Sequence, residues 1–283
     1  MSVVFCHEDE TGRFMRVERR PDRRLAGLVH KYAGYLHRTT RPLRRREPAQ
    51  DAVTLILNLG PPLRVGGPTL SPVDAGSFVA ALNDSYGITE ELGMLHGLQV
   101  DLSPLGAHML LGVPMRELSA LIVPLEEVVG PSLPILLEQL FLAPGWDVRF
   151  GLLEAFIAAR LDEAPRPSPD VAWAWRRLGE TSGRLAIGAL AQELGCSRRH
   201  LVARFREQIG PAPKTAARIL RFQKATDLLA VDDGRRFAEI AESCGYFDQA
   251  HLNRDFREMA GTTPSAFVAS RLPEGFGIAA GRS

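Results

Sequence analysis

Side chains that can hydrogen-bond to nucleic-acid bases recur on the outward faces of two short predicted helices. Arginine can make two hydrogen bonds to guanine, glutamine or asparagine can do the same with adenine, and valine or alanine can meet the thymine methyl group. The residues that suit base contacts are Arg199, Val202 and Ala203 in the first helix and Gln249, Ala250, Asn253 and Arg254 in the second. Arg198, Arg206 and Arg254 suit phosphate contacts. For Arg206 and Arg257, the role of an ordinary solvated side chain remains an open alternative.

One sequence pattern that contains these side chains occurs twice between Ile187 and Pro264. Gly195 corresponds to Gly245, 50 positions later, and Phe205 corresponds to Phe256, 51 positions later. Internal similarity of this kind indicates one structural unit used twice. The change of offset predicts one extra residue in the turn of the second copy.

Each copy has the pattern of two helices joined by a tight turn, at about 187–207 and 237–258. In the first copy, Gly195 fits a backbone position with positive φ after a helix. Ser197 can then cap a second helix, whose Leu201 and Phe205 share one buried face. This is the helix-turn-helix pattern, in which the second helix, the recognition helix, enters the major groove of DNA.

The C-terminal region resembles the AraC/XylS family of bacterial transcription regulators. The resemblance extends over residues 171–270. It is carried by both helix-turn-helix patterns, by Arg221, Ala225, Leu228 and Leu229 in a helix that starts near Pro213, and by Gly245, Tyr246, Phe256, Gly261 and Pro264. It implies a DNA-binding domain at 171–272, in which Arg199, Val202 and Ala203 stand where the family's first recognition helix contacts bases.

Charge is unevenly distributed along the 283-residue chain, whose formal net charge is +1. From Asp170 onward there are 17 Lys plus Arg and 13 Asp plus Glu, a net +4, while the preceding residues have 17 and 20, a net −3. The positive half is the one that contains the duplicated pattern. Because +4 is modest, we expect any basic surface to be local.

Composition and cysteine usage exclude several classes of protein. Three widely spaced cysteines, Cys6, Cys196 and Cys244, are too few for a disulfide framework or a zinc cluster. No signal peptide and no apolar run long enough to cross a bilayer are visible. The sequence therefore predicts a cytoplasmic, nucleoid-associated protein without membrane contact, metal or cofactor.

The N-terminal half has the pattern of short strands followed by helices, so the predicted fold class is α+β. Val53 to Leu59 alternates apolar and polar residues, and further strands are expected at 77–82 and 94–102. Together they predict a small β-barrel or sandwich. Residues 1–24 are interpreted as an exposed arm or edge strand, Arg44 to Arg46 as a solvated loop, and the tail after Arg271 as frayed.

Helical periodicity replaces the strand pattern after Met115. Helices are expected around Leu118, Leu121 and Ile122, then over 133–141 and 150–161. Three prolines between Asp162 and Asp170 predict an extended linker at 163–170. It separates an N-terminal domain at 1–162 from the C-terminal domain, which consists of helices alone.

The first half also resembles the sensor half of one subgroup of the same regulators, at residues 56–60 and 97–118. This resemblance implies a domain that binds an effector, dimerises, or does both. The sequence therefore predicts a sequence-specific DNA-binding transcription regulator without catalytic residues. Its partner is double-stranded DNA, while RNA polymerase, a small-molecule effector and a second copy of the chain remain open.

Two other classes of function stay open at this point. Some relatives join this DNA-binding unit to alkyl-transfer repair chemistry, which needs several metal-held cysteines. The N-terminal half offers only Cys6, which argues against that enzyme. The other class is a sensor that binds a protein partner.

Overall fold

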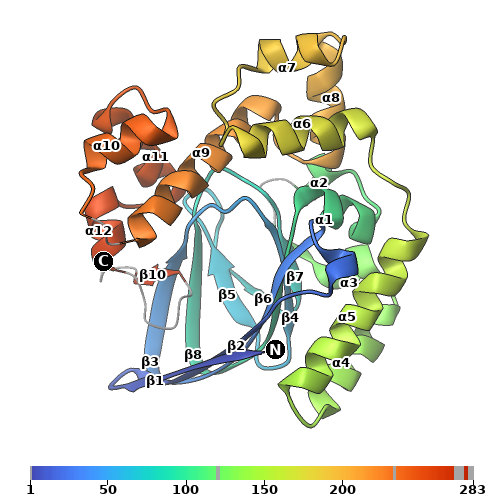
Figure 1. Ribbon diagram of the computed structural model, residues 1–283. Coiled ribbons are helices and arrows are strands. Elements are labelled where there is room, and N and C mark those ends of the chain that lie inside the picture. Colours follow the sequence, from blue (N-terminus) through green and yellow to red (C-terminus); the bar gives the residue numbers. More distant parts are fainter. Residues whose placement is uncertain (1, 119–121, 232–233, 271–276, 280–283) are drawn as a thin grey trace.

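The computed structural model describes residues 2–118, 122–231, 234–270 and 277–279, with a β-sheet in the N-terminal half and helices alone in most of the C-terminal half (Figure 1). The strands are β1 (Val3–Asp9), β2 (Gly12–Arg19), β3 (Val29–Glu47), β4 (Val53–Asn58), β5 (Leu63–Gly66), β6 (Val73–Ala75), β7 (Phe78–Ala80), β8 (Gly87–Leu102), β9 (Ile122–Pro124) and β10 (Ile278–Ala279). A 3-10 turn covers Arg23–Leu25.

The sheet is antiparallel and bends over itself. Its order is β1-β2-β3-β8-β4-β7-β9, with β5, β6 and β10 attached beside this path. The long strands β3 and β8 pair along most of their length, with a shift of register between Thr39 and Leu43. On one side of the shift, β8 pairs with β4. On the other side, β8 pairs with β5 and β3 pairs with β10. The described strands form a sandwich-like sheet and not a closed barrel, so the sandwich prediction is confirmed.

The alternation predicted for β4 is present in the structure. Val53, Leu55 and Leu57 are buried in the main core, while Thr54 and Ile56 lie on the opposite face of the strand. Successive side chains of a strand point to opposite faces, which explains the pattern. The opposite face is the one that borders the cavity described below.

Helices cover the core-facing side of the sheet. They are α1 (Pro104–Leu111), α2 (Met115–Leu118), α3 (Leu125–Val129), α4 (Ser132–Leu142) and α5 (Trp146–Glu163). Phe150 of α5 packs against Tyr32 of the sheet, with ring centroids 6.3 Å apart. The helices predicted over 133–141 and 150–161 are confirmed.

The helix predicted around Leu118, Leu121 and Ile122 is only partly correct. Leu118 ends α2, Leu121 lies outside the described residues, and Ile122 begins β9. Strand β9 pairs with β7, so pairing with a neighbouring strand decides the conformation of Ile122. Its apolar character fits either element.

The C-terminal half consists mainly of helices. They are α6 (Pro169–Glu180), α7 (Ile187–Glu193), α8 (Arg198–Gln208), α9 (Pro213–Ala230), α10 (Phe237–Cys244), α11 (Gln249–Met259) and α12 (Pro264–Ala269). Their core contains Phe205, Phe222 and Phe256, each fully buried. Figure 1 shows α9 running between the α7–α8 pair and the α10–α11 pair. Within the described residues, no helix is both long and apolar enough to span a membrane.

Two predictions for terminal or charged segments are wrong. Arg44 to Arg46 do not form a loop, because they belong to β3, and Arg45 is 3% exposed. In the tail after Arg271, Ile278 and Ala279 are not frayed, because they pair with β3; residues 271–276 and 280–283 lie outside the described residues. The interpretation of residues 1–24 as an arm or edge strand holds for β1, which is an exposed edge of the sheet. It is wrong for β2, which pairs with both β1 and β3 and contains buried Phe14 and Val17.

Candidate functional site

The first helix-turn-helix unit has the local geometry predicted from its sequence. Gly195 follows α7 with φ +62°, in the left-handed region that glycine adopts without strain. The hydroxyl of Ser197 accepts a hydrogen bond of 3.2 Å from the backbone N–H of His200. Leu201 and Phe205 are buried, so the opposite face of α8 is turned away from the core.

The second unit repeats this arrangement with a longer turn. Gly245 has φ +78°, and the carboxylate of Asp248 caps α11 by accepting a 2.7 Å hydrogen bond from the N–H of His251. Gly245 and Asp248 are three positions apart, whereas Gly195 and Ser197 are two apart. The predicted extra residue is therefore present in the turn.

The ten predicted DNA-contact residues all lie on α8 and α11. Eight are exposed: Arg198, Arg199, Ala203, Arg206, Gln249, Ala250, Arg254 and Arg257. Val202 and Asn253 are half-buried. The guanidinium of Arg198 lies directly over Gly188 of α7, which has no side chain to displace it. The two sets are accessible to a ligand, and their contact with DNA remains a prediction.

An aromatic side chain that the sequence analysis overlooked lies next to the second set. Phe247 exposes 93% of its surface, more than any other large apolar residue among those described. It directly precedes Asp248, the N-cap of α11, while its neighbour Tyr246 is buried. Exposing so large an apolar ring next to a candidate binding surface is costly in water.

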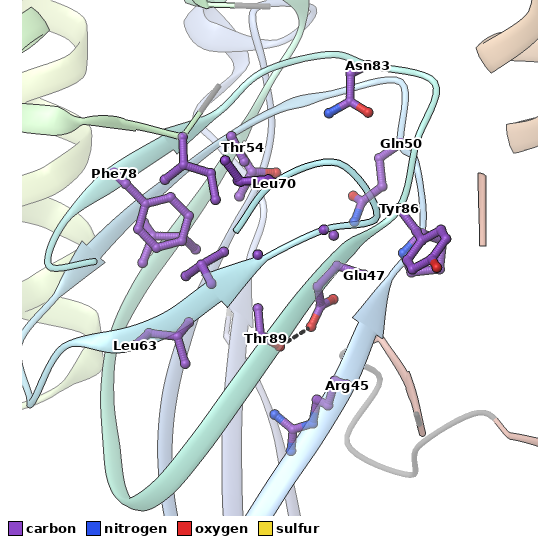
Figure 2. A pocket seen from close by; sticks show the side chains of 18 of the residues that line it. Arg45, Glu47, Gln50, Thr54, Leu63, Leu70, Phe78, Asn83, Tyr86 and Thr89 are labelled. Carbon is purple, nitrogen blue, oxygen red and sulfur yellow. Dashed lines mark hydrogen bonds between the residues drawn. The ribbon is translucent and has the colours of Figure 1, made fainter. Parts of the chain in front are cut away.

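A cavity of about 230 Å³ lies inside the sheet region. Its apolar wall is formed by Ile56, Leu63, Val65, Phe78, Ala80 and Leu95. These side chains belong to a hydrophobic cluster that is separate from the main core. Figure 2 shows Phe78 and Leu63 on one side of the cavity, with Glu47, Gln50 and Tyr86 on the other.

The other wall of the cavity is polar and charged. Arg45 and Glu91 form an ion pair with 3.0 Å between Nη2 and Oε1, and both side chains are buried. Nδ1 of His37 lies 3.2 Å from Oε2 of the same glutamate. The hydroxyl of Thr89 donates a hydrogen bond of 2.9 Å to Glu47 (Figure 2). Burial raises the pKa of Glu47, and it outweighs the opposing effects of Arg45 and Thr89.

Segments that line the cavity also touch the C-terminal half. The N–H of Ala49 donates a 2.8 Å hydrogen bond to the carbonyl of Met259, the last residue of α11. Gly261 has φ +67°, and a β-carbon there would lie 2.8 Å from the ring of Tyr86. Ala49 and Tyr86 both line the cavity, so its rim rests against the end of α11.

Arg218 of α9 makes a third contact between the two halves. Its Nη1 donates a 3.0 Å hydrogen bond to Asp84, which lies between the cavity-lining residues Asn83 and Ser85. Its Nε donates 2.9 Å to buried Asp255 of α11, and its Nη2 donates to Glu258. One guanidinium therefore joins the cavity rim to the second recognition helix.

The cavity residues and the contacts around Arg218 were missed by sequence reasoning. No local signal marked them, because the burial of a charge depends on its partner. Only once β3 is known does the alternation of the strand place Arg45 on the same face as Glu47 and Tyr35. The partner Glu91 lies on β8, and only the fold shows that β3 and β8 pair.

Comparison with known proteins supports a helix-turn-helix assignment. A family model described as a helix-turn-helix domain matches residues 190–270. Among solved structures, the chain is similar to ToxT from Vibrio cholerae, with a TM-score of 0.50 and 10% identity, covering 92% of this chain and 98% of ToxT. At that identity the likeness concerns the fold.

Two shorter solved structures match a little over a third of the chain. The C-terminal domain of AraT, a response regulator from Geobacillus stearothermophilus, is 24% identical, with a TM-score of 0.35, covering 38% of this chain and 90% of that one. A DNA-binding transcriptional dual regulator from Escherichia coli K-12 is 20% identical, with a TM-score of 0.32, covering 36% and 97%. A search of curated proteins found no match.

Proposed function

We propose a mode of action for this chain, which carries a helix-turn-helix domain of the AraC/XylS type and is a DNA-binding transcription regulator. It acts in the cytoplasm, on chromosomal DNA, and is not an enzyme. Its α8 and α11 enter the major groove, and a small molecule held in the cavity controls the position of α11. The contact of the cavity rim with α9 and α11 carries this proposal.

The domain boundaries in this proposal are those expected from the sequence. Residues 1–162 form the sensor domain, 163–170 the linker and 171–272 the DNA-binding domain. Helix α5 ends at Glu163 and α6 begins at Pro169, which fits a linker between them. Residues 271 and 272, at the end of the last range, lie outside the described residues.

Exposed apolar side chains support a second copy of the chain as a partner. Ile135, Phe141 and Leu142 of α4 and Val148 of α5 are between 47% and 71% exposed. Apolar residues that cluster on neighbouring helices mark a contact surface. We therefore place the dimer contact on α4 and α5. A monomer in sedimentation equilibrium at micromolar concentration would contradict it. RNA polymerase remains a further partner, without an assigned surface.

Mapping the chromosomal DNA bound by the full-length chain tests the DNA-binding part of the proposal. We expect discrete sites that share a motif with two halves about 34 Å apart, one helical turn, because α8 and α11 each occupy one major groove. Protection footprints on single sites measure this spacing. Occupancy spread evenly over the chromosome, or a motif with only one half, would contradict the proposal.

Phe247 is expected to contact a thymine methyl group in the second half of each site. Its ring is exposed beside the N-terminus of α11, and recognition helices contact bases mainly through their N-terminal residues. Phe247→Ala should weaken binding to the cognate site by about 1 kcal/mol, roughly fivefold. Phe247→Leu, which keeps an apolar contact, should lose less.

Deoxyuridine in place of thymine removes only the methyl group and so isolates this contact. At one position, the exchange should weaken binding of the native protein and leave Phe247→Ala unaffected. Fluorescence anisotropy with labelled duplexes measures both affinities. Equal sensitivity of the two proteins at every thymine would rule out the contact.

A further inference from the structure

The charged groups in the wall of the cavity carry an excess of carboxylate. Among the described residues, the lining includes two glutamates, Glu47 and Glu91, and one guanidinium, that of Arg45. None of the lining residues that the structure describes is a lysine. A ligand must therefore be compatible with a buried wall in which acidic groups outnumber permanent cations.

The guanidinium of Arg45 already forms an ion pair with a carboxylate. Arg45 lies 3.0 Å from Glu91, and His37 approaches the other oxygen of Glu91 at 3.2 Å. A ligand carboxylate that took over the Nη2 donor of Arg45 would displace Glu91, and this would leave a buried glutamate without that cation. Breaking a buried ion pair in this way is strongly unfavourable.

Glu47 has a different environment. It accepts a hydrogen bond from the Thr89 hydroxyl and forms no ion pair with any described residue. Burial raises the pKa of its carboxyl group and outweighs the opposing effects of Arg45 and Thr89. The polar wall thus offers one carboxyl group that a cation from a ligand could neutralise.

We infer that the cavity selects a small cationic amphiphile, a primary amine with an apolar body, whose ammonium group pairs with Glu47 while the body packs on Leu63, Val65 and Phe78. The inference rests on the proposed effector role of the cavity and adds the chemical class of the ligand. The apolar wall contributes affinity through buried area. The carboxylate contributes specificity, because an acid of the same size meets repulsion. A volume of about 230 Å³ fits a small ligand.

Three probes of nearly equal size test the inference: 2-phenylethylamine, 2-phenylethanol and 3-phenylpropionate. Each is titrated into the full-length chain by isothermal calorimetry. We expect the amine to bind at least tenfold more tightly than the alcohol, and the acid more weakly than both. Glu47→Gln keeps the size of the side chain and removes its charge, so it should reduce the amine-to-alcohol ratio to about one. Thermal melting checks that the variant is folded.

Leu63→Trp serves as a control for the location of the ligand, because the larger ring fills the apolar wall. It should abolish binding of all three probes. Binding of the acid as tight as that of the amine, an amine preference that survives in Glu47→Gln, or failure of all three probes to bind would each overturn the inference.

The same samples titrated with labelled operator DNA separate this inference from the proposed function. Selective amine binding that leaves operator affinity unchanged would support the ligand class and contradict control of DNA binding by the cavity. Acid binding that is lost in Leu63→Trp and that alters operator affinity would support control of DNA binding by the cavity and contradict the ligand class.

Discussion

Replacing Arg218 with alanine is expected to lower the free energy of unfolding by about 3 kcal/mol. Asp255, 2% exposed, loses the guanidinium that donates to it at 2.9 Å and becomes a buried charge without a cation. Burial by itself lowers the pKa of Arg218, but hydrogen bonds to Asp255 and Glu258 outweigh it and raise the pKa. The native interactions therefore favour the charged form strongly. We expect a loss of stability at the lower end of the range for broken buried ion pairs, because the Arg218 side chain is 26% exposed.

Thermal and urea unfolding of the full-length chain measure this loss, which corresponds to a fall in melting temperature of roughly 6–12 °C. Asp84→Ala is the matched control. It removes only the partner of Arg218 in the sheet region, and this ion pair is partly exposed. The variant should therefore lose less than about 1 kcal/mol of unfolding free energy. The double variant Arg218→Ala/Asp255→Ala should recover part of the stability, since the unpaired charge is gone. Equal losses in Arg218→Ala and Asp84→Ala would contradict the role assigned to Asp255.

The same two variants separate stability from control of DNA binding. Asp84→Ala leaves Arg218 bound to Asp255 and Glu258 of α11 but removes one of the contacts of the cavity rim. Under the proposed mode of action, the variant keeps its operator affinity and loses part of the response to a cavity ligand. A contact can transmit a signal only where the ligand distinguishes two states of that contact.

The helix-turn-helix units could be predicted from the sequence because their signals are local. Gly195 and Gly245 supply the positive φ after a helix, and Ser197 and Asp248 cap the next helix within three residues. The spacing of the buried leucine and phenylalanine then determines which face of each recognition helix is exposed. Each of these signals operates over a few residues, so no knowledge of the rest of the chain is needed.

The cavity and its charges could not be predicted because they depend on contacts between distant residues. Arg45 stands in a run of three arginines, which resembles a solvated loop. Its burial depends on Glu91 across the β3–β8 pair. Likewise, Asp84 lies in a turn whose composition gives no sign of a contact with α9, 134 residues later. A charged residue is exposed or buried according to its partner, and here the partner comes from another element.

On the cognate operator, Arg199→Ala and Gln249→Ala are each expected to weaken binding by about 1–3 kcal/mol, roughly 5-fold to 150-fold. Both side chains are exposed near the start of a recognition helix. Arginine suits two hydrogen bonds to guanine, and glutamine suits two to adenine. Because these bonds are made only to the correct base, affinity for random DNA should change little in either variant. Anisotropy titrations on both DNAs give the ratio of the affinities for cognate and random DNA directly.

Arg206→Ala provides the contrasting control on the same face of α8. Arg206 is exposed near the C-terminal end of the helix, where a side chain reaches the backbone rather than the bases. Its loss should weaken cognate and random DNA alike and reduce the slope of log affinity against log salt by about 1. If Arg199→Ala and Gln249→Ala also lost affinity equally on both DNAs, α8 and α11 would be phosphate-binding surfaces, and base recognition would have to come from elsewhere. If Arg206→Ala affected only the cognate site, its assignment to phosphate would be wrong.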